Sequence, residues 1–164
     1  MQATRPALAL LVAIALVTAG CSVLQSSDSR TATFENRDST AYNLSAYVVP
    51  NVDDRSDVRF HATTDDRSDR LLAYAEVQWP HGYRNVTIDD DGARSDRFTL
   101  SPNETTSVTM ENVTADAAVI YVVERSNGSL VHVGFPFCDG GNSVEDYHLT
   151  LSGGRGASWS HGCR

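Results

Sequence analysis

The chain has 164 residues and a formal net charge of −8 at pH 7, made of 13 basic and 21 acidic side chains. This length suits one packed domain. The acidic balance disfavours binding to nucleic acid, which needs clustered Lys and Arg against phosphates, and attraction to an anionic membrane surface.

An apolar run over residues 7–20 follows Arg5 and ends at Cys21. It is shorter than the roughly 20 apolar residues of a membrane-spanning helix. A basic start and small residues before a cleavage point predict a secretory signal. The segment Val17-Thr18-Ala19-Gly20-Cys21 resembles the lipobox of bacterial and archaeal lipoproteins, although Thr18 stands where leucine is commonest. Ordinary cleaved secretion and an uncleaved anchor remain as alternatives.

The resemblance to lipoproteins implies a location and a domain organisation. In that family the cysteine carries the lipid and becomes the first mature residue, so we expect Cys21 to anchor the protein to the extracellular face of the cytoplasmic membrane. Residues 1–20 are then the signal peptide. Residues 21–30 are Ser-rich and predict a flexible tether. The remaining residues, 31–164, form the domain.

Ten short segments have the alternation and composition of strands and are separated by turn residues. They are 31–35, 41–49, 58–62, 71–79, 83–88, 97–100, 106–110, 117–123, 130–137 and 144–151. Segment 71–79 could instead begin a helix capped by Ser68 or Asp69; we expect a strand, with Trp79 in the core. The Gly-rich segment 153–156 predicts a flexible tail.

Two dipeptides predict hairpins. Asp91-Gly92 lies between the segments 83–88 and 97–100, and Asn127-Gly128 has the composition of a two-residue turn.

Short strands with regular turn signals and no long helix predict an all-β sandwich of roughly seven to ten strands. The segments 34–42 and 98–110 resemble the strand–turn–strand pattern of immunoglobulin-like surface domains. This resemblance implies an immunoglobulin-like β-sandwich. The cysteine and tryptophan spacing of antibody domains is absent, because Cys138 and Cys163 both lie late in the chain.

With Cys21 lipidated, Cys138 and Cys163 form an even pair in an oxidising compartment. A disulfide between them would close a loop of about 25 residues and stabilise the fold by roughly 3 kcal/mol. Two free buried thiols are the alternative. His148 and His161 lie nearby, but their spacing matches no common zinc pattern. We therefore expect no metal and no cofactor.

The chain also carries the marks of an exported protein of high-salt environments. All its basic residues are Arg, and Asp outnumbers Glu by fifteen to six. Asp-rich, Lys-free surfaces resemble those of extremely halophilic archaea. The repeated sequence Asp-Asp-Arg-Ser-Asp, at 53–57 and 65–69, predicts acidic turns of such a surface rather than a cation site. Five sequons mark candidate glycosylation sites at Asn43, Asn85, Asn103, Asn112 and Asn127.

No catalytic motif stands out. The chain has no G-x-S-x-G sequence, and the glycines at 153–156 are not followed by the Lys-Ser/Thr of a phosphate loop. We therefore expect a non-enzymatic, lipid-anchored cell-surface domain that binds an envelope protein or a glycan, or that has a structural role. A solute- or ion-binding lipoprotein and a small exported hydrolase are the alternatives.

Overall fold

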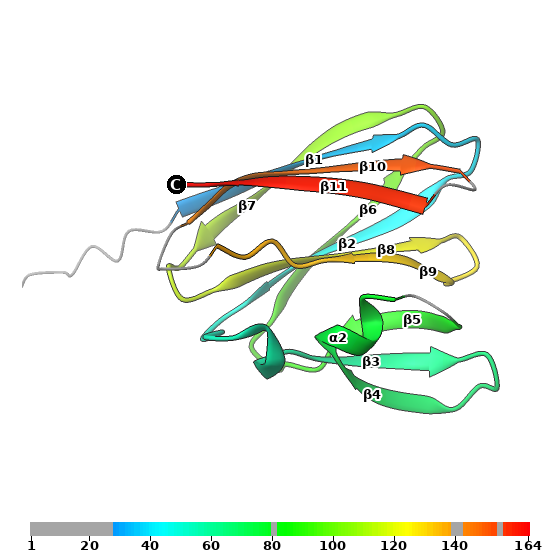
Figure 1. The fold of residues 1–164 in the computed structure, drawn as a ribbon, viewed down its shortest axis with the longest axis horizontal. Helices are drawn as coiled ribbons and strands as arrows, with labels where there is room; N and C mark the ends of the chain where they lie inside the picture. Colours follow the sequence, from blue (N-terminus) through cyan, green and yellow to red (C-terminus); the bar gives the residue numbers. More distant parts are fainter. Residues whose placement is uncertain (1–27, 80–81, 139–142, 154–155) are drawn as a thin grey trace, which may run out of the picture.

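The computed structural model describes residues 28–79, 82–138, 143–153 and 156–164, and these residues are almost entirely β (Figure 1). The strands are β1 (Asp28–Asn36), β2 (Tyr42–Val49), β3 (Arg59–Thr64), β4 (Asp69–Ala73), β5 (Tyr83–Ile88), β6 (Arg94–Leu100), β7 (Thr105–Val113), β8 (Ala118–Arg125), β9 (Leu130–Gly134), β10 (Val144–Ser152) and β11 (Gly156–Cys163). A 3-10 turn, η1 (Arg55–Asp57), and a one-turn helix, α2 (Tyr74–Val77), complete the set. Neither is long enough to cross a membrane, and no other helix is present in the described ranges.

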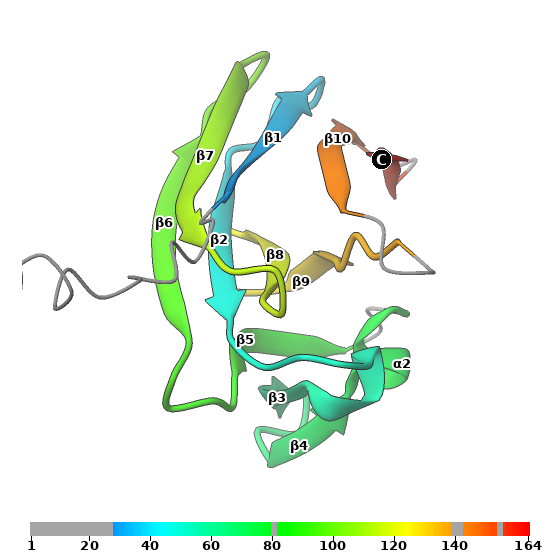
Figure 2. The same ribbon diagram turned by 90° about the vertical axis from the view of Figure 1, so that its left-hand side faces the viewer.

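Three sheets are stacked (Figure 2). The first has the order β11-β10-β1-β7, the second β6-β2-β8-β9 and the third β4-β3-β5. Strands β1 and β10 pair in parallel, and the other pairs are antiparallel. The second sheet lies between the other two, so the predicted sandwich is present and carries a third layer.

The first core fills the space between the first and second sheets. Its centre is aromatic: the Phe34 ring meets the Tyr121 ring edge-on at 5.2 Å, and Tyr121 stacks on Tyr147 at 4.9 Å between ring centroids. Each of these three side chains is at most 1 % exposed. Such close aromatic pairs add roughly 0.5–1.5 kcal/mol beyond the burial of their area.

The second core lies between the second and third sheets. Phe60 of β3 and Val86 of β5 pack there against Ile120 and Val122 of β8. Because successive side chains of a strand point to opposite faces, β8 sends Val119, Tyr121 and Val123 to the first core and Ile120 and Val122 to the second. The uninterrupted apolar run at 117–123 is therefore the sequence of a strand buried on both faces.

The segment 71–79 is not one strand, which corrects the prediction. Strand β4 ends at Ala73 and the helical turn α2 follows. The Glu76 carboxylate accepts a hydrogen bond from the Ala73 N–H at 2.8 Å and so fixes the start of the turn. The turn places Tyr74 and Val77 together in the second core, whereas a strand would send them to opposite faces. Trp79, expected in the core, is 70 % exposed.

The two predicted hairpins have different outcomes. Asn127-Gly128 does connect the paired strands β8 and β9, but within a four-residue connection, 126–129, in which Gly128 has φ +80° and its N–H donates to the Arg125 carbonyl. The prediction for Asp91-Gly92 is wrong. Strand β5 pairs with β3 and β6 pairs with β2, so this turn passes between two sheets.

Both ends of the described domain are more ordered than the composition predicts. Strand β1 begins at Asp28, inside the segment expected to be a tether. At the other end, a strand that was not predicted, β11, pairs with β10 from Gly156 to Cys163 and begins at the last residue of the Gly-rich segment 153–156 that was expected to be flexible. Its inward positions, Ala157 and Trp159, face the same side as buried residues of β10, so alternation continues into this Ser- and Gly-rich segment. Residues 154–155 lie outside the described ranges.

Candidate functional site

The molecule has two distinct ends. The leader end is the one where β1 starts, and the far end is the one where β1 finishes (Figure 1). Since β10 runs parallel to β1, it also starts at the leader end, where Val144 pairs with Cys163 at the end of β11. The candidate lipid site Cys21 lies outside the described residues.

A cavity of about 480 Å³ lies at the leader end between the first and second sheets. Strands β1 and β10 of the first sheet and β8 of the second contribute to its walls, together with the segment after β9. The apolar and aromatic residues that line it are Val52, Val119, Tyr121, Phe135, Phe137 and Tyr147. Val119, Tyr121 and Tyr147 belong to the first core, whereas Val52, Phe135 and Phe137 belong to the second core or pack against it, so the lining draws on both cores.

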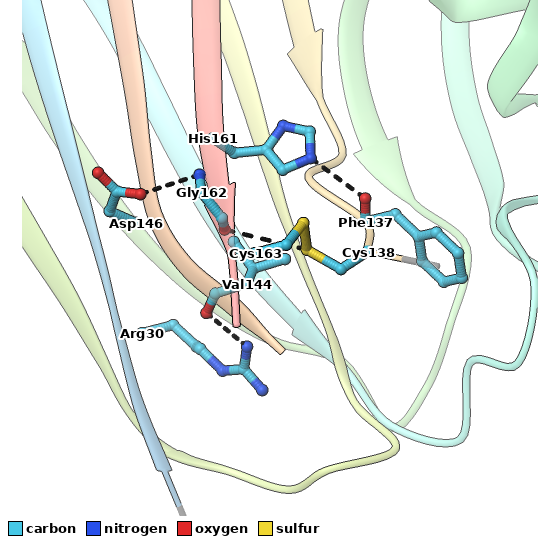
Figure 3. The surroundings of a disulfide bond; sticks show 8 residues. All are labelled: Arg30, Phe137, Cys138, Val144, Asp146, His161, Gly162 and Cys163. Atoms are coloured by element: carbon cyan, nitrogen blue, oxygen red, sulfur yellow. Dashed lines mark hydrogen bonds between the residues drawn. A yellow bond between two sulfur atoms is a disulfide. The ribbon is translucent and has the colours of Figure 1, made fainter. Parts of the chain in front are cut away.

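Two hydrogen-bond donors belong to this cavity. Arg30 of β1 lines it and donates from Nη1 to the Val144 carbonyl at 2.7 Å (Figure 3). Its buried Nε has no hydrogen-bond partner in the part of the chain that the structure describes. Tyr121 is 1 % exposed and lines the same cavity, to which its hydroxyl adds a second donor group. Burial raises the pKa of Tyr121, and the positive charge of Arg30 opposes this effect. Arg30 thus keeps donor capacity that no described residue uses.

The rim of the cavity is acidic. Asp53 after β2, Asp116 before β8 and Glu145 of β10 line it and are exposed to solvent. The cavity therefore combines an apolar interior with one inner cation and an outer ring of solvated carboxylates.

The predicted disulfide is present beside the cavity. Cys138, which lines the cavity, is bonded to Cys163 with 5.8 Å between their Cα atoms, inside the range that a disulfide requires. His161 stands next to it and its Nε2 bonds the Phe137 carbonyl at 3.2 Å (Figure 3). The two sulfurs and a His161 nitrogen lie within 4.8 Å of one another. A metal would need these sulfurs as thiolates, so metal binding competes with the disulfide.

The sequon asparagines are all exposed. Three have a positive φ: Asn85 at 52°, Asn103 at 57° and Asn112 at 57°. The fold gathers Asn43, Asn85 and Asn127 at the far end. Asn43 and Asn85 line one surface hollow, and the Asn85 N–H bonds the Gly128 carbonyl in the loop that holds Asn127.

The remaining two sequons lie at opposite ends. Asn103 precedes Glu104, whose carbonyl bonds the Asn36 N–H at the finish of β1, so it belongs to the far end. Asn112 precedes Val113, which pairs with Asp28, so it belongs to the leader end. The fold thus places four of the five candidate glycosylation sites at the far end.

The sequence reasoning missed the cavity. Arg30 was assigned to the tether and Tyr121 to an ordinary strand, and no motif links them. The signal available was the apolar run at 117–123, which indicates a doubly buried strand but not that one end of the core stays open.

Residues 1–164 match the family described as halobacterial Ig domain proteins. The chain belongs to this family. This match confirms the immunoglobulin-like fold that the sequence predicted. It also confirms the predicted resemblance of the chain to proteins of halophilic archaea. No curated protein matches it. Membership indicates a surface or structural domain of a kind that is typically non-enzymatic.

Proposed function

We propose that this halobacterial Ig domain is a non-enzymatic domain anchored by a lipid on Cys21 to the extracellular face of the cytoplasmic membrane, where it binds a component of the envelope. The observation that carries the proposal is the position of β1. It starts at Asp28, seven residues after Cys21, at one end of the molecule. Seven residues span at most about 25 Å, so an anchor at Cys21 turns the leader end toward the membrane.

The sequons support the same orientation. With the leader end at the membrane, the far end projects outward and carries exposed Asn43, Asn85, Asn103 and Asn127. Glycans on these four residues would cover the outward end and not the cavity at the leader end. Asn112 is the single sequon near the membrane side.

A small exported hydrolase is disfavoured by the placement of the histidines. His61 bonds Asp89 at 2.8 Å and His148 bonds Asp146 at 2.9 Å, but all four side chains are about half exposed and none lines the cavity. Small-solute binding is the second candidate function, and the cavity favours it.

The anchoring proposal is tested with Cys21→Ser in the native host, with Ser22→Ala as the matched control. We expect the unchanged protein and the control to stay in the membrane fraction and Cys21→Ser to leave it, because only the cysteine can carry the lipid. Mass spectrometry of the membrane form should give a modified Cys21 as the first residue. Membrane retention of Cys21→Ser, or an uncleaved leader, contradicts lipid anchoring.

A further inference from the structure

We propose that the cavity at the leader end is a binding site for an apolar molecule that carries a carboxylate. The inference deepens the proposed function, because it rests on a binding role and names the chemistry of the ligand. Three features of the described residues carry it: the size and walls of the cavity, the two donors inside it and the position of the charges around it.

The size and the walls fit a small apolar ligand. About 480 Å³ lies within the 300–1,000 Å³ of ordinary ligand pockets. Val52, Val119, Phe135 and Phe137 provide aliphatic and aromatic surface, with the Tyr147 ring beside them. The Tyr147 hydroxyl is already hydrogen-bonded to His132 Nε2 at 2.9 Å, so Tyr147 contributes its ring to the cavity wall.

The donors select the charge of the ligand. A guanidinium has five N–H donors, and Arg30 gives one hydrogen bond among the described residues, to the Val144 carbonyl. A partly buried cation without an anionic partner is costly, and a carboxylate can accept two parallel hydrogen bonds from a guanidinium. The Tyr121 hydroxyl adds a second donor in the same cavity. Together they match the oxygens of one carboxylate.

The acidic rim disfavours an anionic ligand, so the proposal must be tested by comparing an apolar anion with an apolar cation. Asp53, Asp116 and Glu145 would attract a cation, but they are exposed, and salt screens exposed charges strongly. Arg30 is partly buried and screened less. In molar salt the inner cation therefore outweighs the rim, and the apolar anion binds better than an apolar cation of the same length.

The experiment is isothermal titration of the full-length Cys21→Ser chain in molar NaCl with octanoate, 1-octanol and octylammonium. These probes share one alkyl chain and differ in the head group. We expect octanoate to bind about tenfold tighter than octylammonium, with octanol between them, because a charge-assisted hydrogen bond is roughly twice as strong as a neutral one.

Two variants locate the site. Arg30→Met keeps an apolar stem and should weaken octanoate binding by about tenfold, and Tyr121→Phe removes one hydroxyl and should weaken it several-fold. Arg37→Met, which removes an exposed arginine paired with Glu35, and Tyr83→Phe are the matched controls and should leave binding unchanged. The comparison of the three probes needs no variant at Arg30 or Tyr121, so it tests the preference for a carboxylate even if Arg30→Met fails to fold.

Octylammonium binding as well as octanoate, or no binding of either, would overturn the proposal. Octanoate binding that is indifferent to both Arg30→Met and Tyr121→Phe would do the same, since it would lie elsewhere on the protein. A failure of lipid anchoring appears in cell fractionation and leaves these titrations unaffected, so the two proposals fail separately.

Discussion

His132 and Tyr147 form a largely buried hydrogen bond, with 2.9 Å between Nε2 and the hydroxyl oxygen. Burial lowers the pKa of His132 from 6.5 to about 4, and burial likewise raises the pKa of Tyr147. Both groups are therefore neutral at neutral pH, and the pair satisfies two polar atoms without placing a charge in the first core.

This pair predicts a loss of stability in mild acid. The unfolded chain binds a proton on His132 below about pH 6.5, whereas the folded chain resists protonation down to about pH 4. The contribution of neutral His132 to the free energy of unfolding is complete above pH 6.5 and falls by up to about 3 kcal/mol between pH 6.5 and 4. Urea unfolding across this range measures it. His132→Gln, which does not titrate, should flatten this part of the curve; an unchanged slope in the variant contradicts the assignment.

Strand β8 shows how one element holds three layers together. Its side chains are buried on both faces, and β2 repeats the pattern with Tyr47 and Val49 in the second core. The alternation of β2 predicted one buried face, because a two-layer sandwich leaves the other face to solvent. The third sheet covers that second face and turns both strands into central ones.

Ile120→Ala tests the third layer. Ile120 is 0 % exposed in the second core, so the substitution should lower the free energy of unfolding by about 2–5 kcal/mol. In a two-layer sandwich Ile120 would face solvent, and the change would stay within about 0.5 kcal/mol. Chemical denaturation gives the value, and Thr105→Ala on an exposed position of β7 is the control. A cost as small as that of the control would mean that the third sheet does not pack here.

Strand β11 owes its place to long-range contacts. It pairs with β10 along eight residues, the Gly162 N–H bonds Asp146 Oδ1 at 2.9 Å, and the disulfide ties its last residues to Cys138. The clamp closes a loop over 25 residues of sequence separation.

Reduction of the disulfide should therefore lower the free energy of unfolding by about 3 kcal/mol through the entropy of the unfolded chain. It should also make β11 the first site of proteolysis, because a terminal strand frays once its tie is cut. Non-reducing peptide mapping should recover Cys138 and Cys163 as one linked species. Free thiols in freshly isolated protein, or a reduced form as stable as the oxidised one, would refute the role of the bond.

At the scale of the whole molecule, charge dominates the surface. The chain carries a formal charge of −8, and many of its aspartates cap turns. Asp54 accepts from the Ser56 N–H at 2.7 Å in η1, and Asp66 accepts from the Ser68 hydroxyl at 2.9 Å between β3 and β4. The two copies of Asp-Asp-Arg-Ser-Asp thus shape turns while adding negative charge.

This surface predicts that stability rises with salt. Mutual repulsion of the carboxylates destabilises the compact state, and the Debye length shrinks to about 3 Å at 1 M salt. Melting temperatures should climb from low to molar NaCl. The double variant Asp90→Asn and Asp91→Asn removes two exposed charges and should gain less from salt than the unchanged chain. A flat or falling melting temperature would speak against this account.

The sequence by itself determined the local features. Alternation at Tyr42, Leu44, Ala46 and Val48 specifies β2, and Asn127-Gly128 specifies a turn, because strand periodicity and turn chemistry act between near neighbours. The bond between Cys138 and Cys163 was likewise predicted, because these two cysteines are an even pair once Cys21 is set aside as the lipid site. The lipoprotein leader stays a prediction from the sequence, since Cys21 lies outside the described residues.

Only the tertiary structure decided the rest. The layer over Ile120, the helical turn at Tyr74, the strand at Trp159 and the meeting of Arg30 with Tyr121 all depend on which distant segments pack together. The same apolar run suits a strand buried on one face or on two, and a Gly- and Ser-rich tail pairs only when a partner strand and a disulfide hold it. Local preferences amount to about 1 kcal/mol per residue, whereas packing contributes several, so packing decides between them.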